Sequence, residues 1–291
     1  MSWIVESSLT WFQRFCVNVI KSGPVPRHVA FIMDGNRRYA TKVNILKQDG
    51  HTRGFDKLSE TLQWCKELGI KEVTVYAFSI ENFKRSPEEV NALMDLSREK
   101  YKKLIGEKDR LMANGVCIRV IGNTSLLPDD IQSYIAEAVL MTKDNNKVFL
   151  NVAFAYTSRD EITNAVKCIV EGVESNALDV EDVDEQLISD CLYTNHSPDP
   201  DVIIRTSGEV RFSDFLLWQI SDANVFFNEV LWPEYSIWNL LMSVFWYQRC
   251  PNVKEGVRRQ EITTERNHRV REFVKVLDEK RMTRFKNCIR A

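Results

Sequence analysis

Three apolar runs of the sequence are each followed by a polar block that contains arginine. The blocks are Asp34-Gly35-Asn36-Arg37-Arg38, Glu81-Asn82-Phe83-Lys84-Arg85 and Arg205-Thr206-Ser207-Gly208-Glu209-Val210-Arg211-Phe212-Ser213. A guanidinium group makes paired, charge-assisted hydrogen bonds to phosphate oxygens. An aspartate among such cations offers the hard oxygen ligand that Mg²⁺ prefers. Together the blocks indicate a site for two diphosphate groups and one Mg²⁺, with Asp34 as the metal ligand.

Each block taken alone also has a structural interpretation. Asp34 could cap the following helix, and the block that ends at Arg85 could cap a helix that starts at Pro87. Ser213 could begin a helix whose backbone amides would add to anion binding. The agreement of three blocks favours a phosphate site. The motifs Gly-x-x-x-x-Gly-Lys-Ser/Thr and Gly-x-Gly-x-x-Gly do not occur in the sequence, which argues against the usual nucleotide-binding loops.

The elements that must position these blocks are strands and helices in alternation. Short apolar, β-branched runs predict strands at 29–33, 73–79, 116–121, 148–155, 202–205 and 225–231. Helical patterns occupy 52–68, 87–113, 129–144 and 159–174. Such alternation is typical of parallel β-α-β units, so we predict one α/β domain with a central, mostly parallel sheet flanked by helices. Ligands of these sheets bind at the carboxyl ends of the strands, where the polar blocks stand.

Two further regions flank the α/β domain. We expect an amphipathic helix within residues 1–24, a catalytic domain at 25–250 and a basic, helical tail at 251–291. The pattern at 3–20 places apolar residues on one side of a helix, including Trp3, Ile4, Trp11, Phe12 and Phe15. This helix could pack on the body or a partner, or it could lie in a membrane interface, where aromatic side chains are favoured. No run of 18 apolar residues occurs, so no membrane-spanning helix is expected.

The charge and cysteine content exclude two classes of function. The net charge of −2 argues against nucleic-acid binding by the whole molecule. Residues 254–291 carry a charge of +6, but acidic residues alternate with the basic ones, as on a solvated helix. The seven cysteines include no Cys-x-x-Cys pair, so a zinc site is not expected.

The three polar blocks resemble the signature blocks of the cis-prenyltransferases, and Leu231-Trp232-Pro233-Glu234 resembles another. The resemblance covers about residues 25–250 and is strongest to the eukaryotic dehydrodolichyl diphosphate synthase branch. It implies a catalytic subunit that condenses isopentenyl diphosphate repeatedly onto farnesyl diphosphate. The product would be a long-chain polyprenyl diphosphate for dolichol synthesis and protein glycosylation.

The resemblance also implies a role for each site residue. Asp34 would bind Mg²⁺, and Asp34, Asn82 and Arg85 would be the catalytic residues, with Asn82 near the reacting carbons. The allylic diphosphate would be held by Asp34, Gly35, Asn36, Arg37, Arg38, His51 and Arg85. Isopentenyl diphosphate would be held by Arg38, Arg85, Arg205, Arg211 and Ser213.

The growing chain needs an apolar tunnel, and the predicted helix 87–113 offers candidate lining residues. These are Leu93, Met94, Leu96 and Leu104. A helical stripe of this kind could equally belong to the core, and the sequence leaves both interpretations open.

Two departures from the family pattern imply a heteromer. Self-sufficient members carry an Arg-x-Gly motif near the C-terminus, which this sequence lacks, and Val210 and Asn224 stand where they often have His and Glu. An accessory subunit resembling the Nogo-B receptor would supply the motif and anchor the complex, as a peripheral assembly, on the cytoplasmic face of the endoplasmic reticulum membrane. The alternative is a non-catalytic scaffold subunit of the same complex, against which the metal-binding Asp34 argues.

Overall fold

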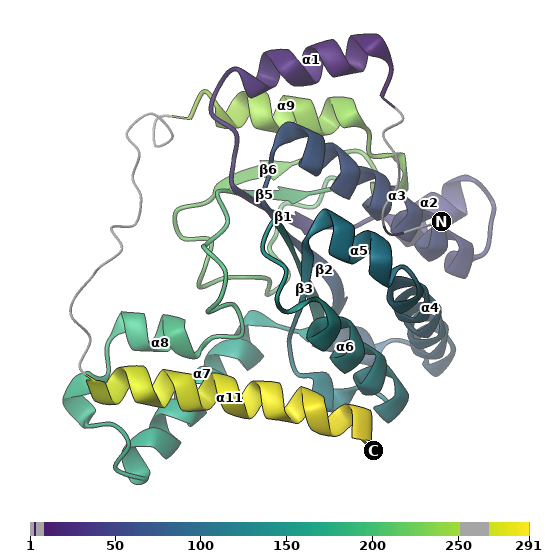
Figure 1. Cartoon of the computed structure of the whole chain (residues 1–291). Helices are drawn as coiled ribbons and strands as arrows, with labels where there is room; N and C mark the ends of the chain where they lie inside the picture. Colours follow the sequence, from purple (N-terminus) through teal and green to yellow (C-terminus); the bar gives the residue numbers. More distant parts are fainter. Residues whose placement is uncertain (1–2, 4–8, 251–267, 291) are drawn as a thin grey trace.

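The centre of the molecule is a six-stranded sheet in which neighbouring strands are parallel (Figure 1). The computed structural model describes Trp3, residues 9–250 and residues 268–290. The strands are β1 (His28–Ile32), β2 (Glu72–Ser79), β3 (Val116–Ile121), β4 (Val148–Tyr156), β5 (Val202–Arg205) and β6 (Asn224–Phe227). The predicted parallel α/β sheet is thereby confirmed.

The order of the strands, β3-β4-β2-β1-β5-β6, makes β1 the point at which the chain changes direction. From β1 the chain passes to β2 on one side, and β5 later joins the other side. The carboxyl ends of β2, β1 and β5 are therefore adjacent. This is the place in an open parallel sheet where a crevice for ligands forms.

Helices cover both faces of the sheet. They are α1 (Trp11–Lys21), α2 (Asn36–Lys42), α3 (Lys47–Leu68), α4 (Pro87–Gly106), α5 (Lys108–Asn114), α6 (Asp129–Thr142), α7 (Ser158–Glu174), α8 (Glu185–Cys191), α9 (Ile237–Tyr247) and α11 (His268–Arg290). Side chains of β1 alternate between the faces: Val29 and Phe31 join the large core under α3, α4, α6 and α9, and Ala30 and Ile32 join a smaller one. Burial on both sides explains the continuous apolar runs of the strands.

Three predicted boundaries were wrong. The helix expected at 87–113 is two helices, because α4 ends at Gly106, a poor helix former, and Glu107 separates it from α5. The helix expected from 52 already begins at Lys47. The last strand ends at Phe227 rather than at residue 231, because the chain beyond it turns to hydrogen-bond the segment after β5.

The N-terminal amphipathic helix is shorter than the predicted 3–20. It begins at Trp11, since Thr10 caps it: the Thr10 side chain accepts from the backbone N–H of Gln13, whose side chain accepts from the Thr10 N–H in return. Trp3 is separate from this helix and buried, with its ring edge-on to Phe55. Ile4 lies outside the described residues.

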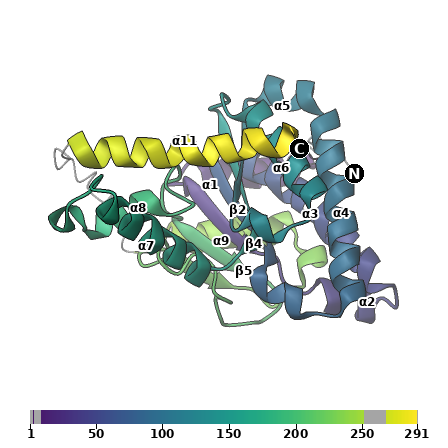
Figure 2. The same cartoon turned by 90° about the horizontal axis from the view of Figure 1, so that it is seen from below.

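The basic tail contains the long helix α11, which lies across α6 and α8 (Figure 2). Arg281 donates to the backbone oxygens of Cys191 and Leu192, and Arg269 is paired with Asp179 and Asp182. Residues 251–267 of the predicted tail lie outside the described residues. Within the described part of the chain, no helix is long and apolar enough to cross a membrane.

Candidate functional site: an arginine-rich cavity

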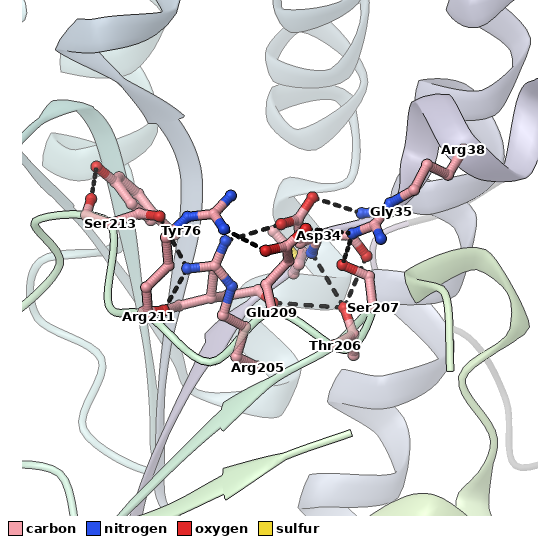
Figure 3. Close-up of polar contacts among 12 residues, drawn as sticks. Asp34, Gly35, Arg38, Tyr76, Arg205, Thr206, Ser207, Glu209, Arg211 and Ser213 are labelled. Carbon is pink, nitrogen blue, oxygen red and sulfur yellow. Dashed lines mark hydrogen bonds and ion pairs between the residues drawn. The ribbon is translucent and has the colours of Figure 1, made fainter. Parts of the chain in front are cut away.

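The three polar blocks meet in one cavity of about 580 Å³ at the carboxyl ends of β1, β2 and β5. All of the predicted site residues line it: Asp34, Gly35, Asn36, Arg37, Arg38, His51, Asn82, Arg85, Arg205, Arg211 and Ser213. Figure 3 shows how several of them point toward one another. The sequence prediction that the blocks come together is therefore confirmed, and the role of each residue stays a prediction.

The turn after β1 depends on Gly35. Its φ of +106° is accessible to glycine, and an added Cβ would stand 2.9 Å from the Leu231 side chain and 3.0 Å from that of Ser207. The Gly35 N–H donates to Asp34 Oδ1 at 2.7 Å. Thr206 also fastens this turn to β5, since its hydroxyl donates to the Asp34 carbonyl at 2.8 Å. Asp34 is thus held in a fixed turn at the cavity wall.

Arg205 lines the cavity, although only 3% of its side chain is exposed. Its Nη2 is 2.8 Å from Asp34 Oδ2, and its Nη1 donates to Ser213 Oγ at 2.8 Å and to the Arg211 carbonyl (Figure 3). One guanidinium therefore joins the turn after β1 to the loop after β5.

A second, more exposed bridge joins the same two segments. Arg38 donates to Ser207 Oγ and lies 3.3 Å from Glu209, which is also paired with Arg211 (Figure 3). The side chains of Arg38 and Arg211 are 50% and 63% exposed, so both can reach a ligand in the cavity.

The block after β2 is a 3-10 helix, Ile80–Lys84, capped by Ser79. The Asn82 carboxamide oxygen accepts from the Ser79 N–H at 3.0 Å, which fixes Asn82 at the cavity wall. Arg85 is paired with Glu89 at 2.7 Å, and Arg37 lies 3.6 Å from the same carboxylate. Glu89 therefore orients two of the predicted diphosphate ligands.

His51 projects from α3 into this cationic environment. Burial, together with the neighbouring charge of Arg85, lowers the pKa of His51 to about 4. Its Nε2 is buried and has no hydrogen-bond partner in the described part of the chain. The imidazole is therefore neutral at pH 7, with a ring nitrogen free to bond a ligand in the cavity.

The expectation that Ser213 begins a helix was wrong. Residues 206–223 form turns, and Ser207, Ser213, Asp214 and Leu216 all have positive φ values between 50° and 78°. Such backbone is strained for residues other than glycine and occurs mostly at functional sites. Tyr76 supports this loop, because its hydroxyl donates to the Ser213 carbonyl at 3.2 Å and its ring stacks on Phe215.

An apolar cavity of about 130 Å³ adjoins the arginine-rich one. The two share Met33, Asn36, His51, Tyr76, Ala77, Phe78 and Leu93 as lining residues. Among the tunnel candidates, Leu93 and Leu96 line this apolar cavity, Met94 is buried in the core, and Leu104 lines a separate cavity of about 80 Å³. The apolar stripe predicted on the helix 87–113 thus contains both cavity-lining and core residues.

Sequence reasoning missed four residues that shape the site. Glu89, Glu209 and Tyr76 hold predicted residues in place, and Arg159 lines the cavity while paired with Asp214. A signal existed for Glu89, because it stands four residues after Arg85 on a predicted helix. Arg159 gave no signal, since its contact with Asp214 is purely tertiary.

The cavity is suited to an anionic ligand with an apolar tail. Its lining holds the six arginines 37, 38, 85, 159, 205 and 211 against the three carboxylates of Asp34, Glu81 and Asp214. The excess positive charge favours a polyanion, and the adjoining apolar cavity offers space for hydrocarbon.

A magnesium ion bound with diphosphate fits this donor set. No cluster of three His, Cys, Asp or Glu residues occurs among the described residues. Mg²⁺, however, is commonly bound by one or two carboxylates together with substrate phosphates and water. Asp34 is a partly exposed carboxylate beside the arginines, so it fits as the single protein ligand of a diphosphate-bound ion.

The sequence matches a model of the prenyltransferase family over residues 32–253. The model is described as "Putative undecaprenyl diphosphate synthase". The match spans strands β2 to β6, all three polar blocks and the helix α9, so it includes the whole of the arginine-rich cavity.

Individual relatives agree with this match. The dehydrodolichyl diphosphate synthase complex subunit of Homo sapiens is 58% identical over 258 residues, 89% of this chain and 78% of that protein. The geranylgeranyl-diphosphate-specific tritrans,polycis-undecaprenyl-diphosphate synthase of Pyrococcus horikoshii is 49% identical over 77% of this chain and 84% of its own. The crystal structure of lavandulyl diphosphate synthase from Lavandula x intermedia, in complex with dimethylallyl diphosphate, superposes with a TM-score of 0.73. It is 32% identical and covers 77% of this chain and 95% of that one.

Proposed function

Since the chain belongs to the cis-prenyltransferases, the family of undecaprenyl and dehydrodolichyl diphosphate synthases, we propose that it is the catalytic subunit of a heteromeric enzyme. It adds isopentenyl diphosphate repeatedly to farnesyl diphosphate. The product is a long-chain, dehydrodolichyl-type diphosphate that serves dolichol synthesis and protein glycosylation.

The observation that carries this proposal is the convergence of three arginine blocks on one cavity with an apolar neighbour. Two diphosphates need more positive charge than one block supplies, and the hydrocarbon tail needs a dry surface. A scaffold subunit would have no use for an aspartate at the centre of the arginines.

The turn after β1 and the block after β2 hold the allylic diphosphate in this proposal. Gly35, Asn36, Arg37, Arg38, His51 and Arg85 surround its oxygens, and Glu89 keeps Arg37 and Arg85 in position. Asp34 would hold Mg²⁺, which supplies positive charge to the departing diphosphate. Arginines fixed in advance stabilise the same developing charge without reorganisation, and so favour carbocation character at the allylic carbon.

The loop after β5 holds isopentenyl diphosphate through Arg205, Arg211 and Ser213, with Arg38 and Arg85 shared between both substrates. The double bond of isopentenyl diphosphate attacks the allylic carbon, and a proton then leaves the new chain. Asn82 lies at the cavity wall and, in this proposal, orients the groups involved in that proton loss. The apolar cavity beside Leu93 and Leu96 receives the growing chain.

A partner subunit completes the site in this proposal. The sequence has no Arg-x-Gly motif, and the human relative is named as a subunit of a complex. Val210, where self-sufficient members often have a histidine, is 76% exposed beside Arg211. An accessory subunit resembling the Nogo-B receptor would bring its Arg-x-Gly tail to this loop.

The complex is proposed to sit peripherally on the cytoplasmic face of the endoplasmic reticulum membrane. Support comes from α1 and α9, which lie side by side (Figure 1). Both helices expose aromatic side chains. Trp11 is 81% exposed, and Phe12 lies 6.0 Å from Trp238 across the two helices. Exposed aromatic residues on neighbouring helices suit the depth of lipid headgroups. Replacement of Trp11 and Phe15 by Ser should weaken co-flotation with vesicles; unchanged flotation would remove this support.

The function is tested by incorporation of labelled isopentenyl diphosphate onto farnesyl diphosphate with Mg²⁺, by the chain alone and with the accessory subunit. We expect long-chain product when the partner is present. Full activity of the chain alone would support the assignment as an enzyme and contradict the proposal that it needs a partner subunit. Absence of product in both reactions would favour the scaffold subunit instead.

A further inference from the structure

Arg205 has an unusual position for a residue that is expected to bind a substrate. Its guanidinium is almost completely buried, and Asp34 is the carboxylate paired with it within the described residues. Its Nη1 bonds Ser213 Oγ and the Arg211 carbonyl, and its Nε is buried without a partner there. A buried cation needs a compensating anion, because removal of one partner of such a pair leaves an uncompensated charge.

Both carboxylate oxygens of Asp34 accept a hydrogen bond in the same arrangement. Its Oδ1 accepts from the Gly35 N–H, and its Oδ2 accepts from Arg205 at 2.8 Å. A cation that takes Oδ2 of Asp34 therefore competes with Arg205. Conversely, an anion that reaches Arg205 weakens its hold on Asp34.

From this shared carboxylate we propose that Asp34 and Arg205 form an ion-pair switch that couples the two diphosphate subsites. Neutralisation of Asp34 on the allylic side leaves Arg205 without its counter-charge, and the second diphosphate then supplies it. Linkage makes the coupling reciprocal, so a diphosphate on Arg205 also frees Asp34 for a cation. The inference rests on the proposed function, since it uses the two subsites assigned there.

The second bridge, Arg38–Glu209–Arg211, does not provide the same coupling. Both of its arginines are at least half exposed, and exposed ion pairs contribute little because water and salt screen them. Arg205 has no such access to water. The coupling energy should therefore concentrate in the buried pair.

The switch is tested by calorimetric titration of isopentenyl diphosphate, and separately of inorganic pyrophosphate, into the full chain with its accessory subunit in EDTA. Asp34→Asn keeps an oxygen for the Gly35 N–H and removes the charge that Arg205 needs. We expect this variant to bind both ligands about tenfold tighter than the wild type, a coupling of ordinary size. In the double variant Asp34→Asn/Arg205→Met, the gain should be lost.

Glu81→Gln is the matched control. It removes a carboxylate from the wall of the same cavity, and Glu81 pairs with Lys84. Its effect should stay within about twofold, as expected for a screened charge. Equal gains in affinity for Asp34→Asn and Glu81→Gln would mean that any lost negative charge near the cavity has the same effect, and would overturn the switch. Unchanged or weaker binding by Asp34→Asn would also overturn it. Tighter pyrophosphate binding without any isopentenyl diphosphate binding would keep the switch and overturn the proposed function.

Discussion

The two ends of the central sheet contain similar residues arranged for opposite purposes. At the carboxyl end, six arginines and three carboxylates surround an open cavity. Toward the amino end, Arg119, Glu72 and Asn151 form a closed network in which Glu72 Oε1 accepts from both partners, at 3.1 and 2.8 Å. Thr74, Ser197 and His28 extend this network.

The difference lies in how far the charged groups are open to a ligand. Glu72 is buried and paired inside the protein, so its network holds strands together. At the carboxyl end Glu89 and Glu209 pair with four of the six arginines, but three of these four are at least half exposed and remain within reach of an anion in the cavity. Exposure beside a cavity, rather than the residue types themselves, distinguishes a binding site from structural support.

The largest effect on activity is expected from replacing Asp34, the carboxylate among the arginines at the carboxyl end of the sheet. Asp34→Ala should lower turnover by about 10³-fold, the scale of losing a preorganised electrostatic contact. The melting temperature should also fall by several degrees, because the buried Arg205 loses its counter-charge. Steady-state incorporation and thermal melting measure the two effects. Normal turnover of this variant in the presence of Mg²⁺ would contradict the assignment of Asp34 as the metal ligand.

At the amino end of the sheet, replacement of a carboxylate should lower the stability of the fold and leave catalysis unaffected. Glu72→Ala leaves Arg119 and Asn151 without their shared acceptor, at a cost of about 3 kcal/mol in the free energy of unfolding. Urea denaturation measures this loss, and Glu72→Gln, which keeps an oxygen acceptor, should lose less. The folded variant should keep wild-type KM values. A stable but inactive Glu72→Ala protein would contradict the division between the two ends.

A smaller effect on activity is expected from replacing Arg211, an exposed arginine at the carboxyl end of the sheet. Arg211→Ala should raise the KM for isopentenyl diphosphate about tenfold, because one charge-assisted hydrogen bond is lost. The KM for farnesyl diphosphate should change little. Arg271→Ala, an exposed arginine on α11, is the control and should change neither value. An effect confined to the allylic substrate would contradict the role given to Arg211.

The open end was largely predictable from the sequence, and the closed end was not. Each arginine block directly follows a strand, so strand periodicity and the parallel topology suffice to bring Asp34, Arg85 and Arg205 together. The contact of Glu72 with Arg119 and Asn151 depends on the register between β2, β4 and β3, and nothing local encodes that register.

Two of the wrong predictions have a common cause. Ser213 looks like a helix start by residue type, but Tyr76, which is distant in sequence, and Arg205 hold it in a left-handed turn. Trp3 fits an amphipathic stripe, yet it packs against Phe55 and donates to the Lys100 carbonyl. In both cases tertiary contacts override the local preference. The parallel sheet was predictable because its apolar runs are continuous and need no such information.

The smallest and sharpest test compares the histidines at the two ends. Burial lowers the pKa of His28, and burial lowers that of His51 to about 4. A histidine whose pKa is depressed in the folded state costs no stability above the unfolded value of 6.5, where the ring is neutral in both states. Stability is lost as the pH falls below 6.5 toward the folded value, by about 1 kcal/mol for His51 near pH 5.5.

Inorganic pyrophosphate should separate these two histidines. In the open cavity an anion favours the charged imidazole, so the pKa of His51 should rise toward 6.5 and its share of the acid sensitivity should shrink. His28 lies in the closed network, hydrogen-bonded to Thr74 and the Pro198 carbonyl, and its pKa should stay where it is. The chain has four histidines, so NMR titration of their ring protons with and without pyrophosphate reads both directly. A buried network that does not contact the cavity should not change when an anion binds there. Equal pKa shifts at His28 and His51 would therefore mean that the amino end of the sheet also responds to the ligand, and would contradict the contrast between the two ends.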